Sequence, residues 1–199
     1  MKRDLRVLAA GGALLLLPAG AASAQKQGGI LKIGHFDSPA SMSMHEESTA
    51  AVNRPLMGVF NNLVVYDQHV LQNSPQSIVP ELATGWAWNE EGTELTLPLH
   101  QGVKWHDGTP FTAADVKCTF ELLQGKAQEK LRINPRKSWY DNLETVTNNG
   151  DYEVTFHLKR PQASFAAMLA TGWSPIYPCH VPPAQMKTAK PSAARPMIR

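Results

Sequence analysis

The chain has 199 residues, of which 19 are Lys or Arg, 17 are Asp or Glu, and 43% are hydrophobic. This near balance of charge excludes a strongly basic protein and gives no electrostatic case for binding nucleic acid or an anionic membrane surface. The length suits one domain, because domains typically have ~100–200 residues. We therefore expect one domain with no nucleic-acid partner.

The first 24 residues have the three-part layout of a secretory signal peptide. Three basic residues precede an apolar run from Val7 to Leu17, and Ala22-Ser23-Ala24 offers the small residues that a signal peptidase needs. The apolar run is shorter than the ~20 residues that span a bilayer, which argues against a membrane anchor. We expect cleavage after Ala24. The remaining chain then has sixteen basic and sixteen acidic residues and no net charge.

The two cysteines of the chain are Cys118 and Cys179. In an oxidising compartment such as the periplasm they could form a disulfide. The alternative is two buried thiols that stay unpaired, because a sequence separation by itself gives no geometry. Both interpretations are open from the sequence.

The first half of the chain predicts short elements separated by polar loops. Apolar residues between Leu56 and Leu63 recur at helical spacing. A glycine-bounded apolar stretch before residue 35 is typical of a strand. In chain order, these patterns predict a strand over residues 29–34, a polar loop over 35–48, a helix over 53–65 that runs into Leu63–Tyr66, and a second loop over 68–80.

The clearest local signal is a helix start around Thr112. Thr112 can cap the helix, and Asp115 lies three residues later, where an acidic side chain can reach back to the cap. Phe111 and Val116 are placed to form a hydrophobic staple. Gly125 is predicted to end the helix.

Two segments alternate with the period of a β-strand. In residues 94–99 three leucines alternate with other residues, and Pro98, which has no backbone donor, predicts an edge strand or a bulge. Residues 152–158 alternate throughout and follow the tight-turn pair Asn149-Gly150. After them we predict a short helix over residues 162–169 and, beyond Met186, a disordered tail.

Several motifs occur together in one order. Residues 79–86 are VPELATGW, residues 102–116 are GVKWHDGTPFTAADV, and residues 151–161 are DYEVTFHLKRP. LVVYD at residues 63–67 and PIYP at residues 175–178 fit the same pattern. Together these segments resemble the family-5 extracellular solute-binding proteins, which are the dipeptide-, oligopeptide- and nickel-binding components of ABC importers.

The resemblance implies an α/β fold like part of lobe one of a type II periplasmic binding protein, with a mixed sheet and flanking helices. It implies a monomeric periplasmic component of an ABC transporter that captures peptides or similar small solutes and delivers them to permease subunits in the inner membrane. No catalysis, cofactor or metal is expected. The expected domains are a signal peptide over 1–24, the N-terminal part of the solute-binding domain over 25–186, and a tail outside the pattern over 187–199.

A ligand is expected to meet the loop after the first strand, because clefts in two-lobed α/β proteins lie at strand ends. We predict Ser38, Ser41, Met42 and Ser43 as ligand-binding residues. Hydroxyl and backbone groups there can bond an extended peptide main chain, and Met42 can adapt to varied side chains.

Three alternatives stay open at this point. Family members are longer than this chain, so it could be a truncated fragment without binding activity, since half a cleft cannot enclose a ligand. His106 beside Asp107 could serve a small secreted hydrolase or a metal site, although Asp107-Gly108 is also a favoured turn pair that leads into the Thr112 cap. The third alternative is an interaction module with no small ligand.

Overall fold

The computed structural model describes Gly34, Asp37 and residues 41–182. The chain divides into two units, residues 1–34 and 35–199, and every element named below belongs to the second unit. The predicted signal peptide, the predicted first strand apart from Gly34, and the predicted tail lie outside the described residues. Within the described part, no helix has both the length and the apolar character needed to cross a membrane.

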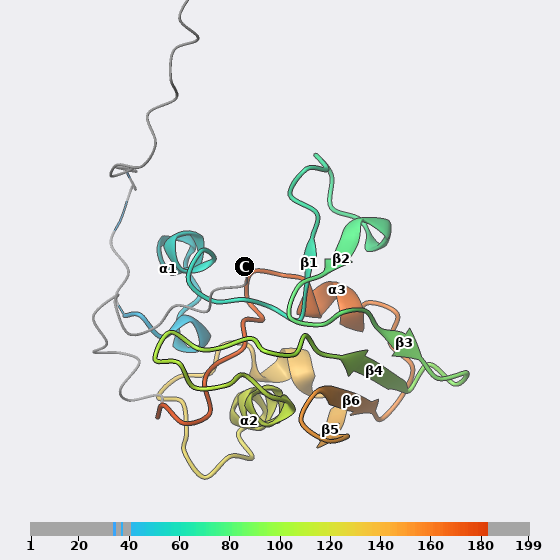
Figure 1. Ribbon diagram of the computed structural model, residues 1–199. Helices are drawn as coiled ribbons and strands as arrows, with labels where there is room; N and C mark the ends of the chain where they lie inside the picture. The colour runs from blue at the N-terminus through green and yellow to red at the C-terminus, as the bar shows by residue number, and fades with distance from the viewer. Residues whose placement is uncertain (1–33, 35–36, 38–40, 183–199) are drawn as a thin grey trace, which may run out of the picture. The chain divides into compact units, whose positions relative to one another are not determined.

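Short helices and strands alternate along the described chain (Figure 1). The helical elements are η1 (Met44–Glu46), α1 (Ala50–Leu56), η2 (Pro75–Ser77), α2 (Ala113–Gln124), η3 (Lys137–Tyr140) and α3 (Phe165–Leu169), where η marks a 3₁₀-helix. The strands are β1 (Val64–Tyr66), β2 (Ile78–Pro80), β3 (Ala87–Trp88), β4 (Glu94–Pro98), β5 (Leu143–Asn148) and β6 (Glu153–Leu158).

The strands form two sheets. β1 pairs with β2, and the other four strands form a sheet of order β3-β4-β6-β5. Each pair among the described residues is antiparallel, so the parallel pairs that a mixed sheet would contain are absent from this part of the chain.

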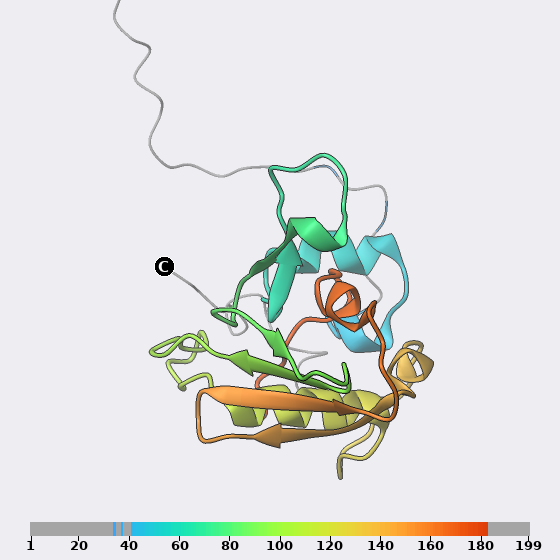
Figure 2. The same ribbon diagram turned by 90° about the vertical axis from the view of Figure 1, so that its right-hand side faces the viewer.

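One face of the four-stranded sheet carries the main hydrophobic core. Phe156 of β6 packs against Phe120 of α2, with ring centroids 4.8 Å apart, and against Phe165 of α3 at 5.5 Å. Figure 2 shows α2 running alongside β5 and β6 on this side of the sheet, in agreement with the contacts between these elements. Val154, Phe156 and Leu158 are all buried, which confirms the alternation predicted for this strand.

Polar side chains join the strands on the opposite face of the sheet. The Oγ1 atoms of Thr96 in β4 and Thr155 in β6 share a hydrogen bond of 2.9 Å. His157 of β6 lies between Thr147 Oγ1 of β5, at 2.9 Å, and Glu94 Oε1 of β4, at 3.1 Å. Cross-strand pairs of this kind contribute roughly 0.2–1 kcal/mol each. The register of the three strands is therefore supported on both faces.

Helix α2 begins and ends where the sequence predicted. Thr112 is the N-cap, and its backbone N–H donates to Asp115 Oδ2 at 3.0 Å. Gly125 follows the last turn with a φ of 71°, a left-handed conformation that carries no Cβ penalty for glycine. Phe111 and Val116 are both buried at the start of the helix, as a hydrophobic staple requires.

The predicted helix over residues 53–65 is wrong at both ends. Helix α1 already begins at Ala50 and ends at Leu56, after which the N–H groups of Val59 and Phe60 both donate to the Leu56 carbonyl and turn the chain. The chain is extended again in β1, where it pairs with β2. Leu56 and Phe60 belong to a second core cluster, so shared burial explains the helical spacing that the sequence showed.

Strand β4 lies inside the sheet and is not the edge strand that Pro98 suggested. It pairs with β3 on one side and β6 on the other. Pro98 is the last residue of β4, and the pairing with β3 stops before it, at Thr96. The next residue, Leu99, donates its N–H to the carbonyl of Tyr152. Because neighbouring residues of a strand point their N–H groups to opposite sides, the missing donor of Pro98 faces the side beyond the end of β3, where the Pro98 carbonyl accepts from the N–H of Thr84.

Strands β2, β3 and β5 were not predicted from the sequence, and the residues of β1 were expected at the end of a helix. The predicted loop over residues 68–80 ends in η2 and β2, whose three residues are too few to show a period. Strand β5 is interrupted by a register shift between Leu143 and Thr145, so its buried residues, Leu143 and Val146, lie three positions apart. A β-bulge of this kind hides the alternation by which a strand is recognised.

Candidate functional site

The predicted ligand-binding loop packs against the second core cluster, which consists of Met44, Val52, Leu56, Phe60 and Tyr177. Ser38 lies outside the described residues. The Ser41 hydroxyl donates to Glu47 Oε1 at 3.1 Å and accepts from the N–H of Ser43 at 3.2 Å. Met42 is half-buried against the second core cluster, and Ser43 is fully buried. Ser41 and Met42 thus keep side-chain surface for a solute, whereas Ser43 does not.

A buried histidine fixes the chain just after this loop. The N–H of His45 donates to the Tyr177 hydroxyl at 3.2 Å, and the two rings lie 4.3 Å apart. Nε2 of His45 is 2.9 Å from the carbonyl oxygen of Pro175, which can only accept, so Nε2 carries the proton. Burial, together with the positive charge of Arg136, lowers the pKa of His45 to about 3. The imidazole is therefore neutral over most of the pH range.

Arg136, the residue before η3, contacts the same cluster. The residue is only 3% exposed, its Nη2 donates to the carbonyl of Met44 at 2.5 Å, and its guanidinium lies 4.6 Å from the ring centroid of Trp173. Burial lowers the pKa of Arg136, while the neighbouring Tyr140 and Tyr177 act in the opposite direction. Because the guanidinium is enclosed, it holds the loop in place and does not face a solute.

The segment His106-Asp107-Gly108 forms a turn, in agreement with the structural interpretation of this motif. Asp107 Oδ1 accepts from the N–H of Thr109 at 2.9 Å, and Gly108 has a φ of 88°. Asp107 Oδ2 lies 2.6 Å from Nε2 of His180, and this hydrogen bond lowers the pKa of Asp107 to about 2. The carboxylate is engaged by Thr109 and His180, so the geometry gives no support to a hydrolase built on His106 and Asp107.

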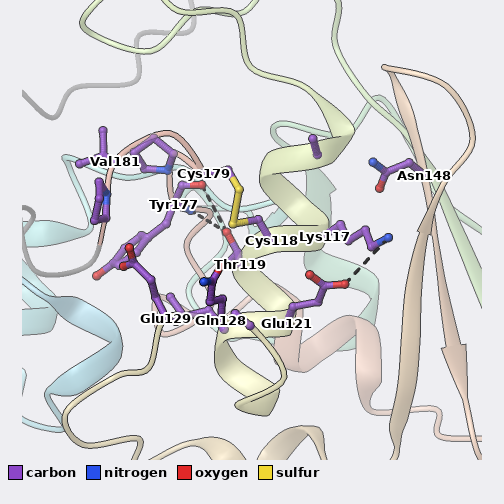
Figure 3. A pocket seen from close by; sticks show the side chains of 15 residues that line it. Lys117, Cys118, Thr119, Glu121, Gln128, Glu129, Asn148, Tyr177, Cys179 and Val181 are labelled. Carbon is purple, nitrogen blue, oxygen red and sulfur yellow. Dashed lines mark hydrogen bonds and ion pairs between the residues drawn. A yellow bond between two sulfur atoms is a disulfide. The ribbon is translucent and has the colours of Figure 1, made fainter.

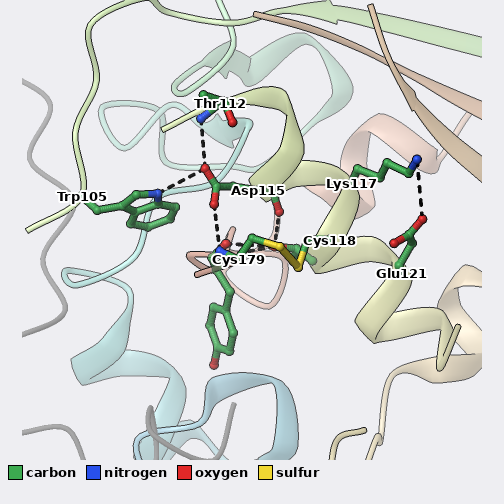
Figure 4. The surroundings of a disulfide bond; sticks show 9 residues. Trp105, Thr112, Asp115, Lys117, Cys118, Glu121 and Cys179 are labelled. Carbon is green, nitrogen blue, oxygen red and sulfur yellow. Dashed lines mark hydrogen bonds and ion pairs between the residues drawn. A yellow bond between two sulfur atoms is a disulfide. The ribbon is translucent and has the colours of Figure 1, made fainter. Parts of the chain in front are cut away.

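Asp115 is the centre of a buried hydrogen-bond network (Figure 4). Its Oδ2 accepts from the indole Nε1–H of Trp105 at 3.2 Å and from the N–H of Thr112 at 3.0 Å. Its Oδ1 accepts from the backbone N–H of Cys179 at 2.8 Å. A helix-capping carboxylate therefore also joins the loop of Trp105 to the segment that carries Cys179.

The structure joins Cys118 of α2 to Cys179 in a disulfide, with the two Cα atoms 5.8 Å apart. A hollow of about 420 Å³ opens beside it (Figure 3). Lys117 and Glu121 on its rim are partly exposed and form an ion pair of 3.9 Å. The volume lies within the ~300–1,000 Å³ of small-molecule sites, but two of the charged groups on its wall, Lys117 and Glu121, pair with each other. The disulfide is its distinguishing chemical feature.

Sequence reasoning did not identify His45, Arg136 or Tyr177 as a unit. The three residues come from η1, from the residue before η3 and from the segment after α3, so no spacing connects them. The motif at residues 175–178 marked the third segment, but nothing in it indicated that Tyr177 would reach the loop of Met42 and Ser43. Among the described residues, no group of three His, Cys, Asp or Glu side chains is placed to hold a metal ion.

The chain was compared with known proteins. The family described as bacterial extracellular solute-binding proteins, family 5 Middle, matches residues 77–197. The oligopeptide-binding protein AppA of Bacillus subtilis is 30% identical over 142 residues, which is 70% of this chain and 24% of AppA. The dipeptide-binding protein of Escherichia coli is 29% identical over 127 residues, which is 57% of this chain and 24% of that protein.

Solved structures give the same result for the fold. AppA of Bacillus subtilis in complex with a nonapeptide superposes with a TM-score of 0.63 at 26% identity, over 78% of this chain and 29% of AppA. A dipeptide-binding protein of Pseudoalteromonas in complex with Met-Leu gives 0.64 at 23% identity, over 72% of this chain and 30% of that one. The chain spans less than a third of the length of these relatives.

The family match covers more than half of the chain and includes the H-D-G turn, the α2 cap and the β5–β6 hairpin. The α/β class and the likeness to type II periplasmic binding proteins are thereby confirmed. This chain belongs to the family 5 bacterial extracellular solute-binding proteins.

Proposed function

We propose that the chain is the N-terminal part of the substrate-binding component of an ABC transporter, which captures peptides or similar small solutes for import. The observation that carries this proposal is the family match over residues 77–197. Relatives of this chain are named for binding oligopeptides and dipeptides. These relatives are binding proteins, and we propose that this chain likewise binds without catalysis.

Within the predicted loop, we assign ligand contact to Ser41 and Met42, together with Ser38. Ser41 and Met42 are partly exposed, whereas Ser43 is enclosed. The flexible thioether of Met42 can adapt to different side chains. The Ser41 hydroxyl already bonds to Glu47 and Ser43, so its contribution would be the second lone pair of its oxygen.

We propose the periplasm as the compartment and the permease subunits of the inner membrane as partners, with the protein acting as a monomer. The N-terminal signal pattern supports export. The disulfide supports an oxidising environment, because exposed disulfides do not persist in the reducing cytosol. A relative in Rhizobium meliloti is named as a periplasmic alpha-galactoside-binding protein, so relatives differ in solute.

A second candidate is a fragment that folds but does not bind a solute. The chain spans between 6% and 31% of the length of the curated relatives compared with it. High affinity for a small solute depends on burying most of its surface. One lobe alone offers only one wall of such a site.

Calorimetric titration of the purified chain with a dipeptide and a tripeptide tests the proposal. Saturable binding is expected, and Met42→Ala should weaken it on the order of tenfold, because truncation of an apolar contact removes roughly 1.5 kcal/mol. Met57→Ala is the control, since Met57 is 48% exposed and lies outside the loop. Saturable binding of a galactoside or a nickel chelate alone would overturn the peptide assignment. Absence of saturable binding with all four solutes would favour the second candidate.

A further inference from the structure

The Cys118–Cys179 disulfide is open to solvent, unlike a crosslink inside a core. Cys179 is exposed and Cys118 is half-buried. Both residues line the hollow of about 420 Å³ beside α2. Figure 3 shows the sulfur atoms at the junction between the α2 ribbon and the segment that carries Tyr177, Cys179 and Val181. A thiol in solution can therefore approach the disulfide without unfolding of the core.

The segment over residues 177–182 is bound to the rest of the fold more firmly at its start than at its end. At its start, the ring of Tyr177 is buried, its N–H donates to Thr119 Oγ1 at 3.0 Å, and its hydroxyl accepts from the N–H of His45. Beyond Tyr177, the side-chain contacts with α2 and the H-D-G turn are the disulfide, the bond from the Cys179 N–H to Asp115, and the exposed His180–Asp107 pair. An exposed ion pair is weak in water, so residues 178–182 are held by the disulfide as their one covalent link to α2, by the Asp115 bond and by the packing of Val181 against the second core cluster.

From this arrangement we propose that the Cys118–Cys179 disulfide is a redox modification site, which a dithiol reductant opens at the hollow to release residues 178–182 from α2. A thiolate of the dithiol attacks Sγ of Cys179, the more exposed of the two residues, and forms a mixed disulfide. The Cys118–Cys179 bond breaks, and Sγ of Cys118 leaves as a thiolate that takes up a proton. The second thiol of the reductant then displaces Cys179, so two electrons and two protons pass to the protein while the dithiol becomes a disulfide.

Opening of the disulfide is expected to loosen only a short part of the chain. Tyr177 keeps its buried ring and its bond to Thr119 when the disulfide opens, so the chain loosens only beyond this residue. The oxidation state then sets how firmly residues 178–182 are tethered to α2. This inference does not depend on which solute the protein binds.

The rate of reduction in the native state is the first test. The oxidised full chain is incubated with dithiothreitol in the absence of denaturant, new thiols are trapped by alkylation, and the alkyl groups are counted by mass spectrometry. The rate is expected to rise in proportion to the dithiothreitol concentration and to exceed the rate of global unfolding. A rate that is independent of dithiothreitol and equal to the unfolding rate would show that the disulfide is shielded, and would overturn the proposal.

Amide hydrogen exchange tests the release itself. In a Cys118→Ser/Cys179→Ser double variant, the amides of residues 179–181 are expected to exchange at least about tenfold faster than in the oxidised chain, because they open locally. The amide of Tyr177 and those of the β5–β6 hairpin should lose only the protection that the lower global stability removes, and should stay better protected than residues 179–181. Unchanged protection at 179–181, or an equal loss throughout the chain, contradicts a local release. Reduced wild-type chain provides the same comparison if the double variant does not fold. Neither measurement uses a peptide, so the results of both are independent of the titration that tests the proposed function.

Discussion

The carboxylate of Asp115 accepts the backbone N–H of Cys179, 64 residues later in the chain, at 2.8 Å. The same side chain accepts from the indole of Trp105 and from the cap residue Thr112. Asp115 is 5% exposed, and hydrogen bonds to a buried carboxylate are strong. A single residue thus couples the start of α2 to two distant segments.

Replacement of Asp115 by Asn should destabilise the fold by about 2–3 kcal/mol, because an amide N–H₂ would face donors that now meet a carboxylate oxygen. Urea unfolding followed by circular dichroism measures the change. Glu121→Gln is the control, since Glu121 lies on the same helix but is partly exposed and forms only a surface ion pair. Its effect should stay within about 0.5 kcal/mol. Equal effects of the two substitutions would contradict the role of Asp115 as a buried hub.

Removal of the disulfide by the Cys118→Ser/Cys179→Ser double variant should lower the free energy of unfolding by about 4 kcal/mol, because the bond closes a loop with a sequence separation of 61. The oxidised chain should lose a similar amount on addition of a reductant, whereas the double variant should not respond to it. A response of the variant to the reductant would show that the reagent acts elsewhere on the protein.

The stability of the fold should fall in mild acid because of His45. Burial lowers the pKa of His45 from 6.5 to about 3, so the unfolded chain binds the proton more readily than the folded chain does. The contribution of neutral His45 to the free energy of unfolding is fully present above pH 6.5. It is lost as the pH falls from there towards about 3.

Urea unfolding at several pH values across this window measures the effect. His45→Gln is the matched variant, because its side-chain amide can still donate to the carbonyl of Pro175 but does not titrate. Its free energy of unfolding should depend less on pH than that of the wild type, while other groups titrate equally in both proteins. Parallel pH profiles of the two proteins would contradict a neutral buried His45.

Gly125→Ala should cost about 1 kcal/mol, because Gly125 has a φ of 71°, in the left-handed region that a Cβ disfavours. Space is not the cause, since the nearest atoms to an added Cβ are 3.7 Å away on the flexible Lys137 side chain. Gly85→Ala is the control: no atom lies within 4 Å of a Cβ built there and its φ is not in that region. Thermal unfolding of both variants should show a lower midpoint for Gly125→Ala alone.

The features that the sequence predicted well depend on neighbouring residues. The cap formed by Thr112 and Asp115, the end of α2 at Gly125 and the Asp107-Gly108 turn are each built from residues within a few positions of one another. The alternation in β6 likewise depends on residues within a single strand, whose alternate side chains face the hydrophobic core. The order of the motifs also identified the family, because each motif is a local segment and their order along the chain can be read directly from the sequence.

Features that depend on residues far apart were decided only by the tertiary structure. Pro98 is tolerated inside the sheet because β3 ends before reaching it, and the bulge in β5 appears only through its pairing with β6. Ser43 is buried, and the cluster beside its loop includes Tyr177, which lies more than a hundred residues later in the chain. The sequence by itself determined the local conformations and the family. The enclosure of the loop, the neutral state of His45 and the pairing of the cysteines required the packing of segments that no spacing in the sequence connects.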